Sequence, residues 1–144
     1  MIVSQMLKSK DDPGLIWVKP TDSVTDAVKL LSEKRIGTVV VSTDGKVPAG
    51  ILSERDIVRE MGRRGTTCLT EPVGEMMTSK ITTCSPSDTA LEVLEVMTNG
   101  RFRHLPVMDG GMMIGLISIG DAVKGRLAQL AMEKDALEGM IMGH

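Results

Sequence analysis

Apolar residues along the chain alternate between helical spacing and short continuous runs. Apolar positions three and four residues apart predict one helix over residues 26–33 and a second over residues 88–98. A short run follows each helix, over 38–42 and 104–108, and its β-branched and aliphatic residues predict a strand. The pattern therefore indicates a chain in which helices and strands alternate.

A turn follows each of these short runs. Asp44-Gly45 and Asp109-Gly110 stand at the two turns, and glycine accepts the positive φ that a tight hairpin turn requires. Beyond each turn lie a second apolar run and then a segment with helical spacing. These predict strands over 49–52 and 113–117 and helices over 54–61 and 119–132.

The same series of elements occurs twice, which marks an internal repeat. Residues 19–24 match residues 85–90 in type and order. Residues 50–56 match residues 115–121, one position out of step with the first match, so one residue is missing from a turn of the second copy. The chain is therefore a tandem of two similar units.

Each copy begins with a short strand, which we expect over residues 15–18 and 81–83. We interpret Pro20 and Pro86 as the residues that open the helix after it, because proline is tolerated in a first turn. Each copy then has the order strand, helix, strand, strand, helix. This order predicts a mixed α/β (α+β) fold.

A linker and a tail complete the chain. Gly62, Gly65 and Pro72 interrupt regular structure between the copies. Leu130 and Leu137 in the tail predict an amphipathic helix that extends the last repeat helix and either packs on a partner chain or stays on the surface. The expected segments are 1–66 for the first repeat with its N-terminal segment, 67–80 for the linker, 81–132 for the second repeat and 133–144 for the helical tail.

Composition restricts the class of protein. With 144 residues, 42% of them hydrophobic and 25% charged, the chain is one module that can bury a core. The 12 methionines supply flexible core filler where aromatic residues make up only 1%. Modules that bind nucleic acids use aromatic platforms or positive charge, and this chain has a net charge of −2. We therefore expect no nucleic-acid partner.

Cysteine and hydropathy patterns exclude further classes. Cys68 and Cys84 have no CxxC spacing and no histidine cluster nearby, so we expect reduced thiols and no metal site. The first residues lack a basic segment followed by a long apolar stretch, and no apolar run approaches about 18 residues. We expect a soluble, cytoplasmic chain without a membrane partner.

The duplicated motifs resemble those of a known family. Each copy carries Pro-[Thr/Ser]-Asp near its start and Gly-x-x-Ser-x-x-Asp near its end. Residues 73–78, Val-Gly-Glu-Met-Met-Thr, and residues 103–107, Arg-His-Leu-Pro-Val, are also typical of that family. From about residue 15 to about residue 127 the chain resembles a tandem pair of cystathionine-β-synthase (CBS) domains, also called a Bateman module.

The resemblance implies a fold and a regulatory function. The two β-α-β-β-α repeats would pack in pseudo-twofold symmetry through their sheets and leave clefts that bind adenosine-containing ligands such as AMP, ADP, ATP, NAD or S-adenosylmethionine. By resemblance, the expected partners are a nucleotide, a second copy in a homodimer and a regulated protein. The alternatives are a dimeric scaffold with vestigial clefts and an S-adenosylmethionine sensor.

No catalytic motif accompanies the resemblance. The chain has no phosphate-binding Gly-x-x-x-x-Gly-Lys-[Ser/Thr] loop, no His-Glu-x-x-His and no Gly-x-Ser-x-Gly. His104 has no histidine or cysteine cluster around it in the sequence that would indicate a nucleophile or a metal. We therefore expect no enzyme activity and no obligatory cofactor.

Two aspartates are the strongest site candidates. Asp56 and Asp121 each follow a serine, Ser53 or Ser118, by three residues, where a strand passes into a helix. A carboxylate there can accept both ribose hydroxyls, and the helix N-terminus favours a phosphate. Ser-x-x-Asp is also close to a capping box, in which serine and acid satisfy the first turn of the helix. Both interpretations remain open.

Cationic and polar residues near the motifs extend the set. Arg55, Arg101 and Arg103 are candidates for phosphate, with Arg35 a weaker one, because a guanidinium pairs bidentately with phosphate oxygens; the alternative is exposed surface cations. His104 would bond to base or phosphate, or be structural. The nucleotide-binding candidates are Thr38, Ser53, Arg55, Asp56, Lys80, Ile81, Thr83, Arg101, Arg103, His104, Pro106, Ser118 and Asp121.

The two copies are not equivalent. Trp17 stands where the second copy has Thr83, and Gly120 stands where the first has Arg55, so ligand specificity would differ between clefts or one cleft would stay empty. By family position, an apolar slot for adenine would be lined by Leu15, Trp17, Val39, Leu52, Ile81, Thr83, Leu105 and Ile117.

Overall fold

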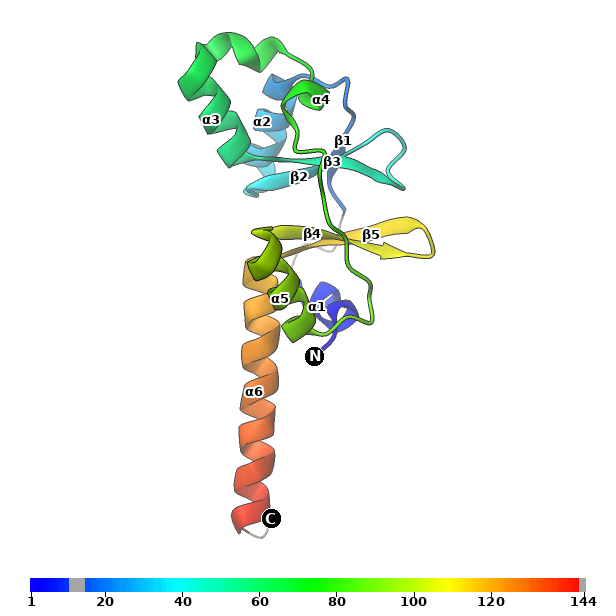
Figure 1. Ribbon diagram of the computed structural model, residues 1–144, viewed down its shortest axis with the longest axis vertical. Helices are drawn as coiled ribbons and strands as arrows, with labels where there is room; N and C mark the ends of the chain where they lie inside the picture. Colours follow the sequence, from blue (N-terminus) through cyan, green and yellow to red (C-terminus); the bar gives the residue numbers. More distant parts are fainter. Residues whose placement is uncertain (11–14, 143–144) are drawn as a thin grey trace. The chain divides into compact units, whose positions relative to one another are not determined.

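The structure is a computed structural model that describes residues 1–10 and 15–142 (Figure 1). Its contacts divide the chain into two compact units. The unit built on the first repeat comprises Gly14–Thr82 and Gly110–Ile114, and the unit built on the second comprises Met1–Pro13, Thr83–Asp109 and Gly115–His144. Each unit has its own hydrophobic core.

The first repeat has the expected order of strand, helix, strand, strand, helix. Its strand β2 lies in the middle of a three-stranded sheet, parallel to β1 and antiparallel to β3. Every residue of β2 is buried, which explains its continuous apolar run. The elements are β1 (Trp17–Val18), α2 (Val24–Lys34), β2 (Thr38–Ser42), β3 (Pro48–Ser53) and α3 (Glu54–Arg64).

The turn between β2 and β3 confirms the predicted hairpin. Gly45 has a φ of +74°, and its N–H donates to Ser42 Oγ at 2.9 Å. Asp44 Oδ1 accepts the N–H groups of Lys46 at 2.8 Å and Val47 at 3.1 Å. These bonds lower the pKa of Asp44, and the bond from Lys46 has the largest effect. They also fix the turn.

The expected linker packs as part of the first unit. It forms the short 3₁₀ helix η1 (Gly65–Thr70) and the helix α4 (Val73–Met76). Cys68 and both ends of α4 are buried in the core of the first repeat. Thr78 then exchanges backbone hydrogen bonds with Ile51 of β3 at 2.8 and 2.9 Å. The segment therefore completes the first repeat.

The second repeat lacks the predicted first strand over 81–83. Among the described residues, this part of the chain has a single parallel bridge, between Cys84 and Val107. Pro106, in the facing strand, has no N–H to donate to the carbonyl of residue 82, so the ladder does not extend over 81–83. The remaining elements agree with the prediction and are α5 (Ala90–Gly100), β4 (His104–Asp109), β5 (Met112–Ser118) and α6 (Ile119–Met142).

The prediction that prolines open the helices is wrong. Pro20 and Pro86 lie in turns that precede the N-caps of α2 and α5. In the first turn Asp22 accepts the Lys19 N–H at 2.9 Å and donates its own N–H to the Lys19 carbonyl at 3.0 Å. Asp88 closes the second turn in the same way. Because proline fixes a φ suited to turns, Pro-[Thr/Ser]-Asp is a turn motif ahead of each helix.

The N-terminal segment packs with the second repeat, whereas the sequence pattern grouped it with the first. Its helix, α1 (Val3–Lys8), was not predicted from the sequence pattern. Val3 and Met6 are buried in the core with α5, and the Val3 N–H donates to the Asp88 carbonyl at 2.8 Å. The helix buries its apolar face there because Val3, Met6 and the partly buried Leu7 recur at helical spacing.

Candidate functional site

In the first repeat, Ser53 and Asp56 form a capping box where β3 passes into α3. Ser53 Oγ accepts the Asp56 N–H at 3.2 Å. Asp56 Oδ2 accepts both the N–H and the hydroxyl of Ser53, each at 3.0 Å. The capping interpretation of this Ser-x-x-Asp is therefore correct.

The rest of the Asp56 carboxylate is also engaged. Oδ1 forms an ion pair with Arg59 Nη2 at 2.8 Å and lies 3.5 Å from Thr78 Oγ1. Asp56 is only 6% exposed. A ribose hydroxyl could bind this carboxylate only if one of its present donors moved away. Arg59, whose side chain is exposed, is the donor most free to move.

The equivalent junction of the second repeat is more open. Asp121 Oδ2 accepts the Ser118 N–H at 2.9 Å, and Ser118 Oγ accepts the Asp121 N–H at 3.1 Å. Oδ2 also pairs with Lys10 Nζ at 2.9 Å. Within the part of the chain that the structure describes, Oδ1 has no recorded partner, so one carboxylate oxygen can accept a further hydrogen bond.

Lys10 is a candidate site residue that the sequence pattern did not predict. Its ammonium also donates to the Leu116 carbonyl at 2.9 Å, so it is held between β5 and the start of α6. Burial alone would raise the pKa of Asp121, but the Ser118 N–H and Lys10 outweigh it, and the pKa lies below its usual value. No motif marks Lys10 because it precedes the repeated pattern.

Arg103 and His104 lie next to this junction. The Arg103 carbonyl accepts the N–H of Ile119, the first residue of α6, at 2.9 Å. Burial first, and then the positive charges of Lys10 and Arg103, lower the pKa of His104, while Asp121 acts in the opposite direction. The imidazole is therefore neutral near pH 7 and can accept a hydrogen bond.

A pocket of about 360 Å³ opens beside Asp121, between α1 and α6. Lys10 and Lys124 give it two ammonium groups, and Ser9 adds a hydroxyl. Its volume lies in the range of small-molecule sites. A carboxylate and two ammonium groups in one pocket suit a ligand that carries both hydroxyls and an anionic group.

The first repeat holds its polar candidates at a matching position. Thr38 is buried and lies opposite Ser53 in the β2–β3 register. The Gly37 carbonyl accepts the Glu54 N–H at 2.9 Å, as Arg103 does for Ile119. Arg55 lies in the first turn of α3 and is exposed.

The other candidates are more scattered. Arg35 and Arg101 have φ values of 54° and 58°, because each is the left-handed C-cap of its helix, α2 or α5. Pro106 lies buried in β4, where its carbonyl accepts the Cys84 N–H at 3.0 Å. Lys80 and Thr83 are exposed, and Ile81 is partly buried.

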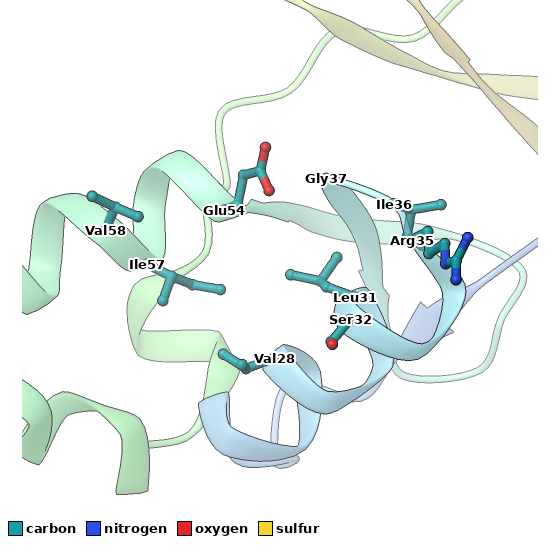
Figure 2. Close-up of a pocket in the computed structure, with 9 residues that line it drawn as sticks. All are labelled: Val28, Leu31, Ser32, Arg35, Ile36, Gly37, Glu54, Ile57 and Val58. Atoms are coloured by element: carbon teal, nitrogen blue, oxygen red, sulfur yellow. The ribbon is translucent and has the colours of Figure 1, made fainter.

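A second groove, of about 450 Å³, lies between α2 and α3 of the first repeat (Figure 2). Leu31 and Ile57 point toward one another inside it, and Arg35 and Glu54 lie near its edges. Neither Ser53 nor Asp56 lines this groove. It is therefore separate from the motif carboxylate.

The expected adenine slot needs correction. Val39, Leu52, Leu105 and Ile117 are 0% exposed and belong to the cores of their repeats, where strands pack on helices. They cannot contact an adenine ring there. The Trp17 ring instead packs on the turn at Gly45.

The described residues contain no metal-binding cluster, no membrane-spanning helix and no disulfide. Over residues 1–10 and 15–142, no cluster of three or more metal-binding side chains occurs. Among those same residues, no helix is long and apolar enough to cross a bilayer. Both cysteines are free and buried, and burial first, with Asp88 adding to it, raises the pKa of Cys84 to about 12.

Comparisons with known proteins agree with the duplicated architecture. The chain is 34% identical over 148 residues to the mitochondrial CBS domain-containing protein CBSX3 of Arabidopsis thaliana, covering 98% of this chain and 72% of that protein. Among solved structures, the CBS-domain containing protein ATU1752 of Agrobacterium tumefaciens is 37% identical with a TM-score of 0.81, over 88% of this chain and 99% of the other. CBSX2, solved in complex with AMP, is 27% identical with a TM-score of 0.72, over 88% and 96%.

The model of the CBS domain matches the chain twice, over residues 10–63 and 73–127. The two matches cover both repeats, and the second extends into the first turns of α6. The α+β fold with two repeats agrees with the solved relatives. The chain therefore belongs to the family of CBS-domain proteins and carries two CBS repeats.

Proposed function

We propose that this chain is a stand-alone regulatory CBS-pair module that binds an adenosine-containing nucleotide and passes its occupancy to a partner protein. The observation that carries the proposal is the state of Asp121. Ser118 and Lys10 fix its Oδ2, while Oδ1 has no partner within the described residues. The carboxylate also lines a pocket of about 360 Å³.

The groups around Asp121 fit the parts of a nucleotide. Ribose hydroxyls are donors, and a fixed carboxylate oxygen is their natural acceptor. Lys10 and Lys124 supply positive charge for a phosphate in the same pocket. His104, neutral near pH 7, and the positive charge of Arg103 lie close to Asp121. The AMP complex of CBSX2 supports AMP as the first ligand to try.

The second repeat is the proposed site of tighter binding. In the first repeat, four donors from three residues, Ser53, Arg59 and Thr78, already surround Asp56. A ribose there would have to displace one of them and leave a charge without its partner. We therefore propose that the clefts differ in affinity and that the first repeat is the weaker or vestigial one.

A thermal-shift panel with AMP, ADP, ATP, NAD, NADH and S-adenosylmethionine tests this function. A ligand at 100 times its dissociation constant adds about 2.7 kcal/mol to the free energy of unfolding, which raises the melting temperature measurably. We expect the rise in wild type and in the control Asp135→Asn, at an exposed position of α6, and its loss in Asp121→Asn. Each rise is measured against the same variant without ligand. Absence of a rise with every ligand would contradict nucleotide sensing and favour a scaffold.

A further inference from the structure

Helix α6 continues well past the elements that it packs against. Its first turns contact α5 and α1, and Ala122 and Gly125 are buried there. Figure 1 shows its C-terminal half running beyond α1 and α5 of the same unit. Every residue from Leu130 to Glu138 is exposed.

An apolar stripe runs along the exposed side of this helix. Its members follow one another at alternating intervals of four and three residues, the spacing of a coiled-coil seam. Each apolar member is at least 42% exposed. Lys134 takes the one polar position in the series. The stripe consists of Val123, Leu127, Leu130, Lys134, Leu137 and Ile141.

The spacing of the stripe residues is symmetric about Met132, so the stripe can pair with a second copy of itself. If two copies of α6 lie antiparallel and centred on Met132, Leu127 faces Leu137 of the partner, and Leu130 faces Lys134 of the partner. Val123 then faces the partner's Ile141. Such an arrangement has a twofold axis, which is the symmetry of most homodimers.

Charges beside the stripe favour the antiparallel direction. Lys124 and Glu138 flank the same edge of the stripe, and the centred register places each against the other on the second helix. Lys134 also lies next to the partner's Glu133 near the axis. Its long apolar stem can cover Leu130 while its ammonium reaches that carboxylate. The one like-charged contact is that between the two Glu133 side chains.

A parallel pair would bring like charges together along its length. Lys134 would face the partner's Lys134 in the seam, and Glu133 would face the partner's Glu138 at both edges. Within one chain, Lys134 already lies 3.7 Å from Glu138, an i,i+4 pair that either arrangement can keep. The charge pattern therefore selects one direction.

We propose that the α6 stripe is a docking surface for a second copy of this chain, with the two helices antiparallel and centred on Met132. This contact and the proposed nucleotide site share Lys124, but the seam residues Leu130 and Lys134 do not line the pocket beside Asp121. The contact can therefore be tested in the absence of nucleotide, and its failure would not contradict the proposed nucleotide binding.

Disulfide cross-linking between two single-cysteine variants tests the register. Leu130→Cys and Lys134→Cys face each other only in the antiparallel pair. We expect an equimolar mixture, with one chain lengthened by a tag, to give the mixed cross-link in preference to either self-product under mild oxidation. Wild type is the control, since both of its cysteines are buried. Self-products from each variant alone, as in a parallel pair, or no cross-link at all would overturn the proposal.

Charge reversal tests the direction by a second route. Glu138→Lys, placed in both cross-linking chains, sets lysine against Lys124 and should lower the yield of mixed product severalfold. Adding Lys124→Glu restores opposite charges and should restore the yield. A parallel pair predicts the reverse for Glu138→Lys, because that change relieves the contact between Glu133 and Glu138. A yield that Glu138→Lys raises, or that Lys124→Glu does not rescue, would contradict the antiparallel contact.

Discussion

At the scale of single residues, the two motif aspartates have the same position and different surroundings. Asp56 is almost fully buried and shares its carboxylate among the capping serine, Arg59 and Thr78. Asp121 is more exposed and keeps one oxygen for another donor. A capping role and a ligand role are compatible in the second repeat, because capping uses only one of the two oxygens. In the first repeat the carboxylate is saturated.

His104 gives a pH-dependent prediction. Its pKa is lowered in the folded protein, mainly by burial, so the unfolded chain binds more protons between that value and about 6.5. The stability that the neutral imidazole contributes should therefore be complete above about pH 6.5. The free energy of unfolding should then decrease as the pH falls through the folded pKa of His104. Urea denaturation between pH 5 and pH 8 measures this change.

The variant His104→Gln is the control for that titration. Without the imidazole, the loss of stability in this pH window should largely disappear, since the carboxylates titrate at lower pH. An NMR titration of the assigned imidazole gives its pKa directly. A value at or above 6.5, or a pH dependence unchanged in His104→Gln, would contradict this account.

At the scale of elements, the second repeat depends on a helix from the other end of the chain. Helix α1 supplies two fully buried side chains, Val3 and Met6, to the core formed by α5, β4 and β5. It also supplies Lys10, just beyond its C-terminal end, to Asp121. The same short segment therefore stabilises the repeat and shapes its candidate site.

Met6→Ala should consequently destabilise the second repeat. Met6 is 2% exposed, and truncation of a buried methionine to alanine costs about 2–5 kcal/mol through lost burial and the cavity left behind. Lys8→Ala, on the exposed side of the same helix, is the matched control and should change stability by less than about 0.5 kcal/mol. Chemical denaturation followed by circular dichroism compares the two. Equal effects would show that α1 does not contribute to the core.

The elements that could be predicted are those with strong local signals. Strand β2 agrees with its predicted limits, because a fully buried strand has a continuous β-branched run. Helix α1 has only six residues and no matching copy, so neither periodicity nor the repeat marks it. The strand expected over 81–83 did not form because Pro106 in the facing strand has no N–H to donate to it. The local composition of residues 81–83 does not show this.

At the scale of the whole molecule, duplication supplies two similar frameworks that have diverged in chemistry. Each CBS repeat places a Ser-x-x-Asp where a strand passes into a helix, and in each the serine hydroxyl accepts the aspartate N–H. What differs is the neighbours of each carboxylate, namely Arg59 and the linker's Thr78 in one unit and Lys10 in the other. Sequence comparison of the copies could therefore locate both aspartates but could not rank them. The ranking depends on tertiary contacts.

Calorimetric titration of AMP into wild type, Asp121→Asn and Asp56→Asn tests the central claim most directly. Loss of a hydrogen bond to a charged group costs about 1.5–3 kcal/mol, so Asp121→Asn should weaken AMP binding roughly tenfold to a hundredfold. Asp56→Asn should leave the tighter site within about threefold of wild type, because its carboxylate is already saturated. Tight AMP binding that survives Asp121→Asn and is lost in Asp56→Asn, or no binding by the wild type, would contradict the account.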